Sequence, residues 1–384
     1  RASIKEGLSY QQTATLDRSI ELGPIKMFLE LTITLVKILF IVGLTVGFFA
    51  PVLTWVERKQ SAIMQDRVGA NRADIMGFTA LGLFHAIADA IKMFTKEDFV
   101  PQGANRFLHT LSPIIAVIPA ILTFAVVPFG GQYELWGTNV NLVISDLDVG
   151  LLFVFAIASI ATYGYVIAGW ASNNNWSLLG SMRTASQMIS YEVTMGLTII
   201  GVLMVYGSMK LTEIGAAQED FLSWGFFMQP LGFFMFLAAS IAENKRIPFD
   251  APEAESELVA GYFTEYSGLK FGMFFMAEFI EMVTIGAIVT ILFFGAWHIP
   301  FLSAATILSW LDFLGANGAN LVLMLIHIAV FFAKVIFFIW FQMTIRWTLP
   351  RFRYDQIMKL GWKILLPLSL ANILVTGLVI LAIQ

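Results

Sequence analysis

Acidic side chains inside long apolar stretches are the residues of this sequence with the clearest chemical potential. Glu192 stands within one such stretch. Glu278 and Glu281 stand within another, and their spacing of three places them on one helical face. A charge in the hydrocarbon core of a membrane costs several kcal/mol and is rarely there by accident. Burial raises the pKa of a carboxyl and a nearby cation lowers it, so a group held between these effects suits a proton path. Glu243 stands at the end of a third stretch, and we expect these four glutamates to form a buried row. The alternative is that they make hydrogen bonds between helices that only fix the helices in place.

The row leads into the most acidic part of the chain, the stretch from Glu243 to Lys270. Pro248 and Pro252 prevent a continuous helix here, and Pro252 suits the first position of a short one. Crowded carboxylates repel one another, so their protonation should respond to any nearby change in charge. The alternative is a solvated acidic face, but interspersed apolar residues favour a loop packed against another part of the protein. The carboxylates of the stretch are Glu243, Asp250, Glu253, Glu255, Glu257 and Glu265.

The remaining ionisable residues narrow the possible chemistry. The chain has no cysteine, which excludes disulfides and thiolate-held iron–sulfur clusters. Its 4 histidines lie far apart in the sequence without ligand spacing, so no metal site is predicted. Lys334 stands near the middle of an apolar segment and is a further candidate for the proton path.

Composition predicts that these residues lie on membrane-spanning helices. Of the 384 residues, 58% are hydrophobic and 13% are charged, against about 25% charged in soluble domains. The apolar runs are continuous, and several reach the ~20 residues that cross a bilayer core as a helix. We expect an all-α polytopic membrane protein with about eight transmembrane helices and short amphipathic loop helices. The predicted spans are 29–56, 108–129, 149–171, 185–206, 226–243, 268–297, 320–345 and 364–383.

A ninth segment, 77–99, is shorter and contains charged residues. Lysine and arginine concentrate in the cytoplasmic loops of membrane proteins. If 77–99 is a re-entrant or tilted helix, the lysines and arginines of the loops between the spans divide clearly. The loops on one side carry nearly all of them, and the loops on the other side carry only Lys210. We therefore expect both termini outside, with 1–28 as an N-terminal extension and 29–384 as a single transmembrane domain. The loops expected in the cytoplasm, where the functional motifs lie, are 57–76, 172–184, 244–268 and 346–363.

Five motifs, in this order along the chain, resemble a known family. They are VERKQSAIMQDRVGANR at 56–72, AIADAIKMFTKED at 86–98, GWASNNNWSLLGSMRTASQMISYEVTM at 169–195, ENKRIPFDAPEAESELVAGYFTEYSGLKFGMFFMAEF at 243–279 and TLPRFRYDQIMKLGWK at 348–363. Together they closely resemble the membrane subunit of respiratory complex I that is called the H subunit in bacteria and subunit 1 in mitochondria. The resemblance extends from about residue 29 to 370.

The resemblance implies a quinone-tunnel and coupling subunit of a proton-pumping NADH:quinone oxidoreductase in the bacterial plasma (inner) membrane. Quinone is then the substrate, and no cofactor is expected on this chain alone, because the iron–sulfur clusters and flavin belong to partner subunits. The implied partners are the quinone-site subunits of the peripheral arm, small membrane-arm subunits and the lipid bilayer, with no nucleic acid. The residues that match the family's quinone tunnel are Glu57, Arg58, Arg67, Asp89, Lys92, Arg183, Arg246 and Arg346. Those that match its proton path are Glu192, Glu243, Asp250, Glu253, Glu255, Glu257, Glu265, Glu278 and Lys334.

The chain departs from the family pattern at several positions. A family glutamine is His85 here, the usual asparagine before Arg246 is Lys245, and Glu281 is not among the positions that the resemblance supports. Two other functions stay open: the membrane anchor of an energy-converting hydrogenase or formate hydrogenlyase, and a stand-alone ion antiporter. The completeness of the motifs favours the quinone enzyme over the first, and the lack of a convincing internal repeat disfavours the second.

Overall fold

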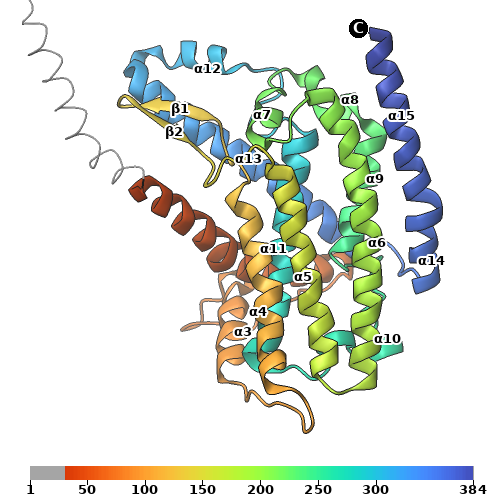
Figure 1. Cartoon of the computed structure of the whole chain (residues 1–384). Helices are drawn as coiled ribbons and strands as arrows, with labels where there is room; N and C mark the ends of the chain where they lie inside the picture. The colour runs from red at the N-terminus through yellow and green to blue at the C-terminus, as the bar shows by residue number, and fades with distance from the viewer. Residues whose placement is uncertain (1–30, 384) are drawn as a thin grey trace, which may run out of the picture.

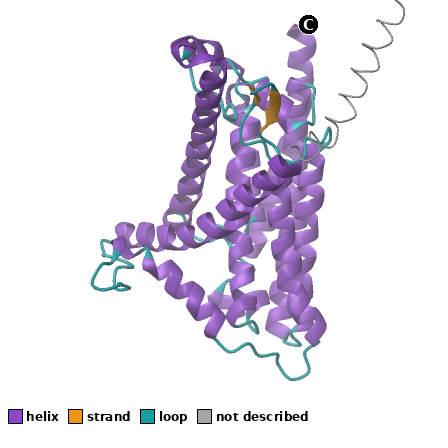
Figure 2. Ribbon diagram, turned by 90° about the vertical axis from the view of Figure 1, so that its left-hand side faces the viewer, coloured by secondary structure: helices purple, strands orange, loops and turns teal. Residues whose placement is uncertain are grey.

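The computed structural model describes residues 31–383, apart from the side chains of Glu255 and Ser256, as a bundle of long helices (Figures 1 and 2). Among these residues, 7 helices are long and apolar enough to cross a membrane, so the predicted all-α polytopic membrane fold is confirmed. The predicted extension 1–28 lies outside the described residues. The helices are α2 (Ala50–Met64), α3 (Phe84–Thr95), α4 (Arg106–Leu122), α5 (Gly150–Ala171), α6 (Asn175–Tyr206), α7 (Leu211–Ala216), α8 (Gly225–Met228), α9 (Pro230–Glu243), α10 (Glu255–Leu258), α11 (Gly268–Phe293), α12 (Ala304–Trp310), α13 (Gly315–Thr348), α14 (Tyr354–Lys359) and α15 (Leu366–Ile383).

The first span continues helically from Leu31 to Met64 and includes a π-helical stretch at Gly43–Phe49. The span predicted at 226–243 is interrupted: Gln229 separates α8 from α9, and Pro230 begins the second helix, where its missing N–H costs nothing. Helix α9 is therefore shorter than the 7 long spans.

Helix α3, in the segment 77–99, is too short to cross a membrane. Its 12 residues extend about 18 Å, whereas the apolar core of a bilayer is about 30 Å thick. None of its residues is buried, and Ile87, Ile91 and Phe94 present an exposed apolar stripe. The helix packs against α2 and α11, at the lower end of the bundle in Figure 1. This placement agrees with the predicted tilted, non-spanning helix.

Helix α11 is the most buried of the spans. In its most apolar 18-residue stretch, 83% is buried. The helix packs against α4, α13 and the π-helical stretch of the first span. Because Glu278 and Glu281 lie on this helix, their carboxylates belong to the interior of the bundle rather than to its lipid-facing surface.

Two predicted loops are partly helical. The Asn174 side chain accepts a hydrogen bond from the backbone N–H of Trp176 at 2.9 Å and caps α6, so the predicted loop 172–184 is helical from Asn175 onward. Helix α2 extends to Met64, so the charged residues at the start of the predicted loop 57–76 project from a helix. The side chains at these positions are consequently held more rigidly than loop residues would be.

A β-hairpin, which the sequence did not predict, occupies part of the segment 130–148. Strands β1 (Gln132–Leu135) and β2 (Thr138–Asn141) pair antiparallel, with Leu135 opposite Thr138. The hairpin lies at the same end of the bundle as α7 and α12, whereas α3 and α10 lie at the other end (Figure 1). This separation agrees with the predicted division between loops that carry the motifs and loops that do not.

Candidate functional site

An ion-paired cluster joins α2, α11, α13 and the loop that follows α9. Nη1 of Arg246 donates to Oε2 of Glu57 at 2.9 Å, and Nη1 of Arg346 lies 2.5 Å from Oε1 of the same carboxylate. Nη2 of Arg246 is 3.7 Å from Oε2 of Glu278. Glu57 and Arg246 are 8% and 5% exposed. One buried carboxylate thus bridges two arginines that are far apart in the sequence.

The charges of this cluster depend on one another. Burial alone lowers the pKa of Arg246, but Glu57 and Glu278 outweigh burial and raise it above its ordinary value. The guanidinium therefore keeps its charge inside the protein. Among the described residues, Nε of Arg246 and Nε of Arg346 have no hydrogen-bond partner. In the described part of the structure, the cluster thus keeps two buried hydrogen-bond donors unused.

An apolar cavity of about 550 Å³ adjoins the cluster, within the range of about 300–1,000 Å³ typical of ligand sites. It lies between the first span and α13, and Phe48, Leu53 and Trp340 are among its lining residues. The cavity reaches Val56, the residue before Glu57, and Met343, which is three residues before Arg346 on the same helix. An apolar molecule in this cavity would therefore have its polar end near the charged cluster.

Other residues matched to the quinone tunnel form a second group between α2 and α3. Nη1 of Arg58 is 2.6 Å from Oδ2 of Asp89, and Nζ of Lys92 is 3.2 Å from the other oxygen of that carboxylate. Arg67 is exposed, and its Nε donates to the side chain of Gln65 at 2.8 Å. The structure thus brings Arg58, Asp89 and Lys92 together and leaves Arg67 outside both groups.

The acidic loop between α9 and α11 is fixed to its surroundings by its own carboxylates. Each of three carboxylates contacts a residue of another segment, so the loop packs against the bundle, as predicted, rather than forming a solvated face. The side chain of Glu255 is outside the described part of the structure. The three contacts are Arg351 Nη2 to Asp250 Oδ2 at 2.5 Å, Arg183 Nη1 to Glu257 Oε2 at 2.6 Å, and Asn174 Nδ2 to Glu265 Oε1 at 2.7 Å.

Two carboxyls of this loop hold protons more tightly than usual. Burial raises the pKa of Asp250 to about 6, although the Arg351 guanidinium opposes the rise. Burial also raises the pKa of Glu253 well above its ordinary value, and Glu278 and Asp250 add to this effect. The Tyr262 hydroxyl donates to Glu253 at 2.7 Å. Near neutral pH, Asp250 would take up a proton in response to new negative charge.

Carboxylates continue from this loop into the interior of the bundle. Each lies within electrostatic range of the next, and together they connect the loop to α11, then to the end of α9 and finally to α6. The last member accepts a hydrogen bond from Ser159 of α5. In order, this carboxylate row contains Asp250, Glu253, Glu278, Glu281, Glu243 and Glu192.

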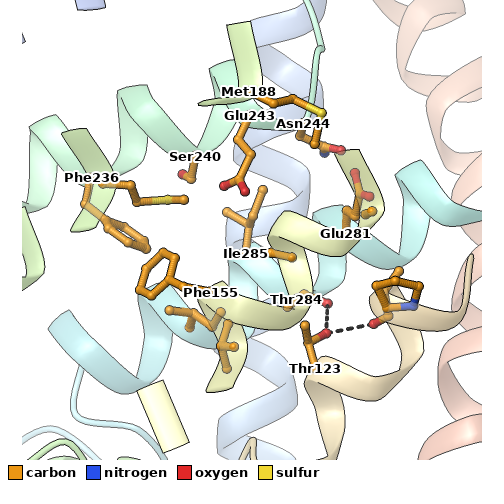
Figure 3. A pocket seen from close by; sticks show the side chains of 17 residues that line it. Thr123, Phe155, Met188, Phe236, Ser240, Glu243, Asn244, Glu281, Thr284 and Ile285 are labelled. Atoms are coloured by element: carbon orange, nitrogen blue, oxygen red, sulfur yellow. Dashed lines mark hydrogen bonds between the residues drawn. The ribbon is translucent and has the colours of Figure 1, made fainter. Parts of the chain in front are cut away.

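Part of the row lines a small internal cavity, shown in Figure 3. Its volume is about 60 Å³, and Glu243, Asn244, Glu281 and Thr284 are among its polar lining residues. One water molecule needs about 30 Å³, so the cavity is large enough for water beside both carboxylates. Both side-chain polar atoms of Asn244 lack a protein partner within the described residues. Most of the lining is apolar, but the cavity has room for water between the carboxyls of Glu281 and Glu243.

Lys334 lies apart from the carboxylate row. Its Nζ donates to the backbone carbonyls of Phe294 and His298 at 2.7 Å each and to that of Ala296 at 3.1 Å. These carbonyls follow the C-terminus of α11, where the helix dipole favours a cation. Lys334 therefore caps the C-terminal end of α11. Its place in the proton path stays a prediction.

The structure brings together two histidines that the sequence separates. The ring centroids of His298 and His327 are 5.9 Å apart, and the Tyr133 hydroxyl is 2.5 Å from Nδ1 of His327. Burial lowers the pKa of His298 to about 4, with His327 and Lys334 adding to the effect. Across the described residues, no group of three or more His, Cys, Asp or Glu side chains could hold a metal ion.

Sequence comparisons show which family the chain is similar to. The family model for NADH dehydrogenase matches residues 36–377. The H subunit of NADH-quinone oxidoreductase from Flavobacterium johnsoniae is 47% identical over 329 residues, which cover 85% of this chain and 89% of the relative. The H subunit of Cytophaga hutchinsonii that carries the number 1 is 44% identical over 358 residues, covering 93% and 98% of the two chains. The H subunit of Geobacter metallireducens with the same number is 46% identical over the same length, covering 93% and 99%.

The chain belongs to the H-subunit family of NADH-quinone oxidoreductase. The resemblance based on the five motifs is confirmed, and the chain is a membrane subunit of the complex I type. The match to the family model, 36–377, includes every residue of the ion-paired cluster and of the carboxylate row.

The structure adds candidate functional residues that the five motifs did not identify. Glu281 lies between Glu278 and Glu243 in the row, as the spacing of three had indicated although the resemblance did not. The hydroxyls of Tyr165 and Tyr262 bind Glu281 and Glu253, respectively. A tyrosine in an apolar segment usually needs a hydrogen-bond partner for its hydroxyl, and this was the signal available in the sequence.

Proposed function

We propose that this chain binds quinone and couples its reduction to proton transfer in a proton-translocating NADH:quinone oxidoreductase. The names of its relatives supply the reaction, since they are subunits of NADH-quinone oxidoreductase. The observation that carries the proposal is the position of the Glu57–Arg246–Arg346 cluster. It lies at the start of the carboxylate row, and two of its residues belong to the helices that line the apolar cavity.

The quinone would place its apolar tail in the cavity between the first span and α13. Its carbonyl oxygens would then lie near Arg246 and Arg346, whose Nε atoms are unpartnered among the described residues. Two electrons and two protons convert a quinone to a quinol. In this proposal the electrons come from partner subunits, since the sequence has no cysteine to hold an iron–sulfur cluster.

Coupling begins when reduction places negative charge near the cluster. That charge raises the pKa of Asp250 and Glu253, which burial has already raised, so the acidic loop takes up protons. Transfer along Glu278, Glu281 and Glu243 to Glu192 carries the change toward adjoining membrane subunits. Each step is local electrostatics acting on a loop held by ion pairs.

The same proposal gives the orientation and the partners. The basic loops face the cytoplasm of a bacterial inner membrane, where peripheral-arm subunits with flavin and iron–sulfur clusters cover them, and both termini lie outside. The charge asymmetry supports this orientation, since Lys210 is the lone Lys or Arg in the loops assigned to the other side.

Glu192→Gln in the intact complex tests the proposed coupling. The substitution removes the charge and the exchangeable proton of the last carboxylate in the row but preserves its shape. We expect proton translocation by the complex in sealed vesicles to fall about tenfold, which corresponds to about 1.4 kcal/mol in a barrier. The matched control is Glu219→Gln, an exposed residue after α7. Quinone reduction and proton translocation both at the wild-type level in Glu192→Gln would contradict the proposed path. Hydrogenase subunits in the purified complex would instead favour the anchor function.

A further inference from the structure

Lys245, Glu281 and Tyr165 form a buried cluster inside the carboxylate row. The Lys245 side chain is 0% exposed, and its Nζ lies 3.8 Å from Oε2 of Glu281. The same ammonium is 3.4 Å from the centroid of the Tyr165 ring, a cation–π contact, while the Tyr165 hydroxyl donates to Oε1 of Glu281 at 3.1 Å. Within the described residues, this Nζ has no hydrogen-bond partner. A buried ammonium held only by a long ion pair and an aromatic face is weakly fixed in position.

The backbone at Lys245 indicates that the lysine is kept for its charge. Its φ is 55°, in the left-handed region just after α9. Asparagine adopts this conformation at helix ends more readily than lysine does, because its short side chain bonds to nearby backbone. The family resemblance has asparagine as the usual residue here. Lysine at this position therefore carries a backbone cost that its charge must offset.

Charge balance shows what the ammonium does. The buried region contains the five carboxylates of Glu57, Glu243, Glu253, Glu278 and Glu281, and three cations, those of Lys245, Arg246 and Arg346. Unpaired buried charge is strongly unfavourable, so the excess carboxylates must share protons. Lys245 is within electrostatic range of Glu281, Glu243 and Glu253, and it can stabilise whichever of them is ionised.

We propose that Glu281 is an additional proton-carrying residue between Glu278 and Glu243, with Lys245 as its movable counter-cation. This inference rests on the proposed coupling function. A proton that arrives on Glu281 cancels the attraction holding Lys245, and the ammonium turns toward ionised Glu243 or Glu253. When the proton passes through the cavity to Glu243, Glu281 is again an anion and Lys245 returns to it. One proton moves at each transfer, and Tyr165 keeps the Glu281 carboxylate oriented throughout.

The test measures protons translocated per electron, normalised to the amount of assembled complex, because a purely structural defect would lower the amount of complex and leave this ratio unchanged. The variants are Glu281→Gln, Glu281→Asp and Lys245→Asn. We expect Glu281→Gln and Lys245→Asn each to lower the ratio about tenfold and Glu281→Asp to retain most of it. The control is Ile288→Val, which alters an apolar residue of the same cavity without removing a polar or titratable group and should keep the wild-type ratio.

The double substitution Lys245→Asn with Glu281→Asn covers the case in which a single variant leaves an unpaired charge and does not assemble. It removes both charges and gives residue 245 an asparagine suited to its backbone. We expect the double variant to assemble and to translocate at the reduced ratio. If this variant has the wild-type ratio while Glu192→Gln is impaired, the proposed role of Glu281 and Lys245 is wrong, and the proposed coupling function stands. A wild-type ratio in Glu192→Gln would overturn the proposed coupling function itself.

Discussion

Arg246 and Glu57 are 189 residues apart in the sequence, yet the Arg246 guanidinium donates to the Glu57 carboxylate at 2.9 Å inside the bundle. This contact connects the start of the acidic loop to α2. It also places the arginine next to Glu278, the first carboxylate of the row on α11, whose Oε2 is 3.7 Å from Nη2 of Arg246. The proposed quinone site and the start of the proposed proton path consequently share one buried arginine.

Replacing that arginine should weaken quinone binding more than replacing an exposed one. Arg246→Ala removes a proposed donor to quinone and leaves Glu57 and Glu278 with less compensation. Loss of one partner of a buried pair costs about 3–5 kcal/mol, part of which appears as reduced stability. We expect the apparent KM for quinone to rise at least about tenfold in the assembled complex. Arg58→Ala should raise it less, because that pair is half exposed.

The control for this experiment is Arg353→Ala. That side chain is 73% exposed and pairs with Asp355 at 3.3 Å, so it should leave the quinone kinetics unchanged. Equal KM values for Arg246→Ala and Arg353→Ala would restrict the buried arginine to a structural role.

The acidic loop should lose stability as the pH rises through about 6. Burial raises the folded-state pKa of Asp250 from 3.8 to about 6, so the neutral carboxyl favours the folded loop. This contribution, up to about 3 kcal/mol, is fully present below the unfolded pKa and is lost as the pH rises through the folded one. Arg351 and Arg346 oppose the shift, whereas Glu278 adds to it.

Hydrogen exchange of 244–267 in the solubilised complex can measure this dependence, after correction for the intrinsic effect of pH on exchange. Protection should be greater at pH 5 than at pH 7.5 in the wild type. Asp250→Asn should show a smaller difference in protection between the two values. A wild-type loop that gains protection with rising pH would reverse the sign of the argument.

The sequence predicted those features that depend on short spacing and composition. The spans follow from apolar runs, and the shared face of Glu278 and Glu281 follows from helical periodicity. The hairpin was missed because Trp136 and Gly137 both have positive φ in its turn, and tryptophan is not the Asn or Asp that normally signals such a turn. The pairing of Glu57 with Arg246 and Arg346 depends on helix packing, for which one sequence offers no distance information.

Lys334 should matter more for stability than for proton translocation. Lys334→Met leaves the carbonyls after α11 without their donor, and an unsatisfied buried acceptor costs about 1–3 kcal/mol. We expect a lower melting temperature of the solubilised complex with unchanged protons per electron. The exposed Lys359→Met serves as the control and should change neither quantity. A reduced ratio at wild-type stability would instead support the predicted place of Lys334 in the proton path.

Gly180 offers a way to move the acidic loop without changing any charge. A Cβ at this position on α6 would lie 2.6 Å from Cα of Gly261 and 2.9 Å from the backbone N of Tyr262, so the loop must shift. Such overpacking typically costs about 1–3 kcal/mol. Because Tyr262 binds Glu253, Gly180→Ala should displace that carboxyl and lower both quinone reduction and proton translocation.

Gly196→Ala is the matched control, since it lies on the same helix and a Cβ there meets nothing within 4 Å. Alanine in a helix interior is favoured over glycine by about 1 kcal/mol, so this variant should be at least as stable as the wild type and fully active. If Gly180→Ala were as active as Gly196→Ala, the position of the loop against α6 would not control coupling. Reduced activity in Gly180→Ala alone would show that the placement of the acidic loop, as well as its charge, connects the quinone site to the carboxylate row.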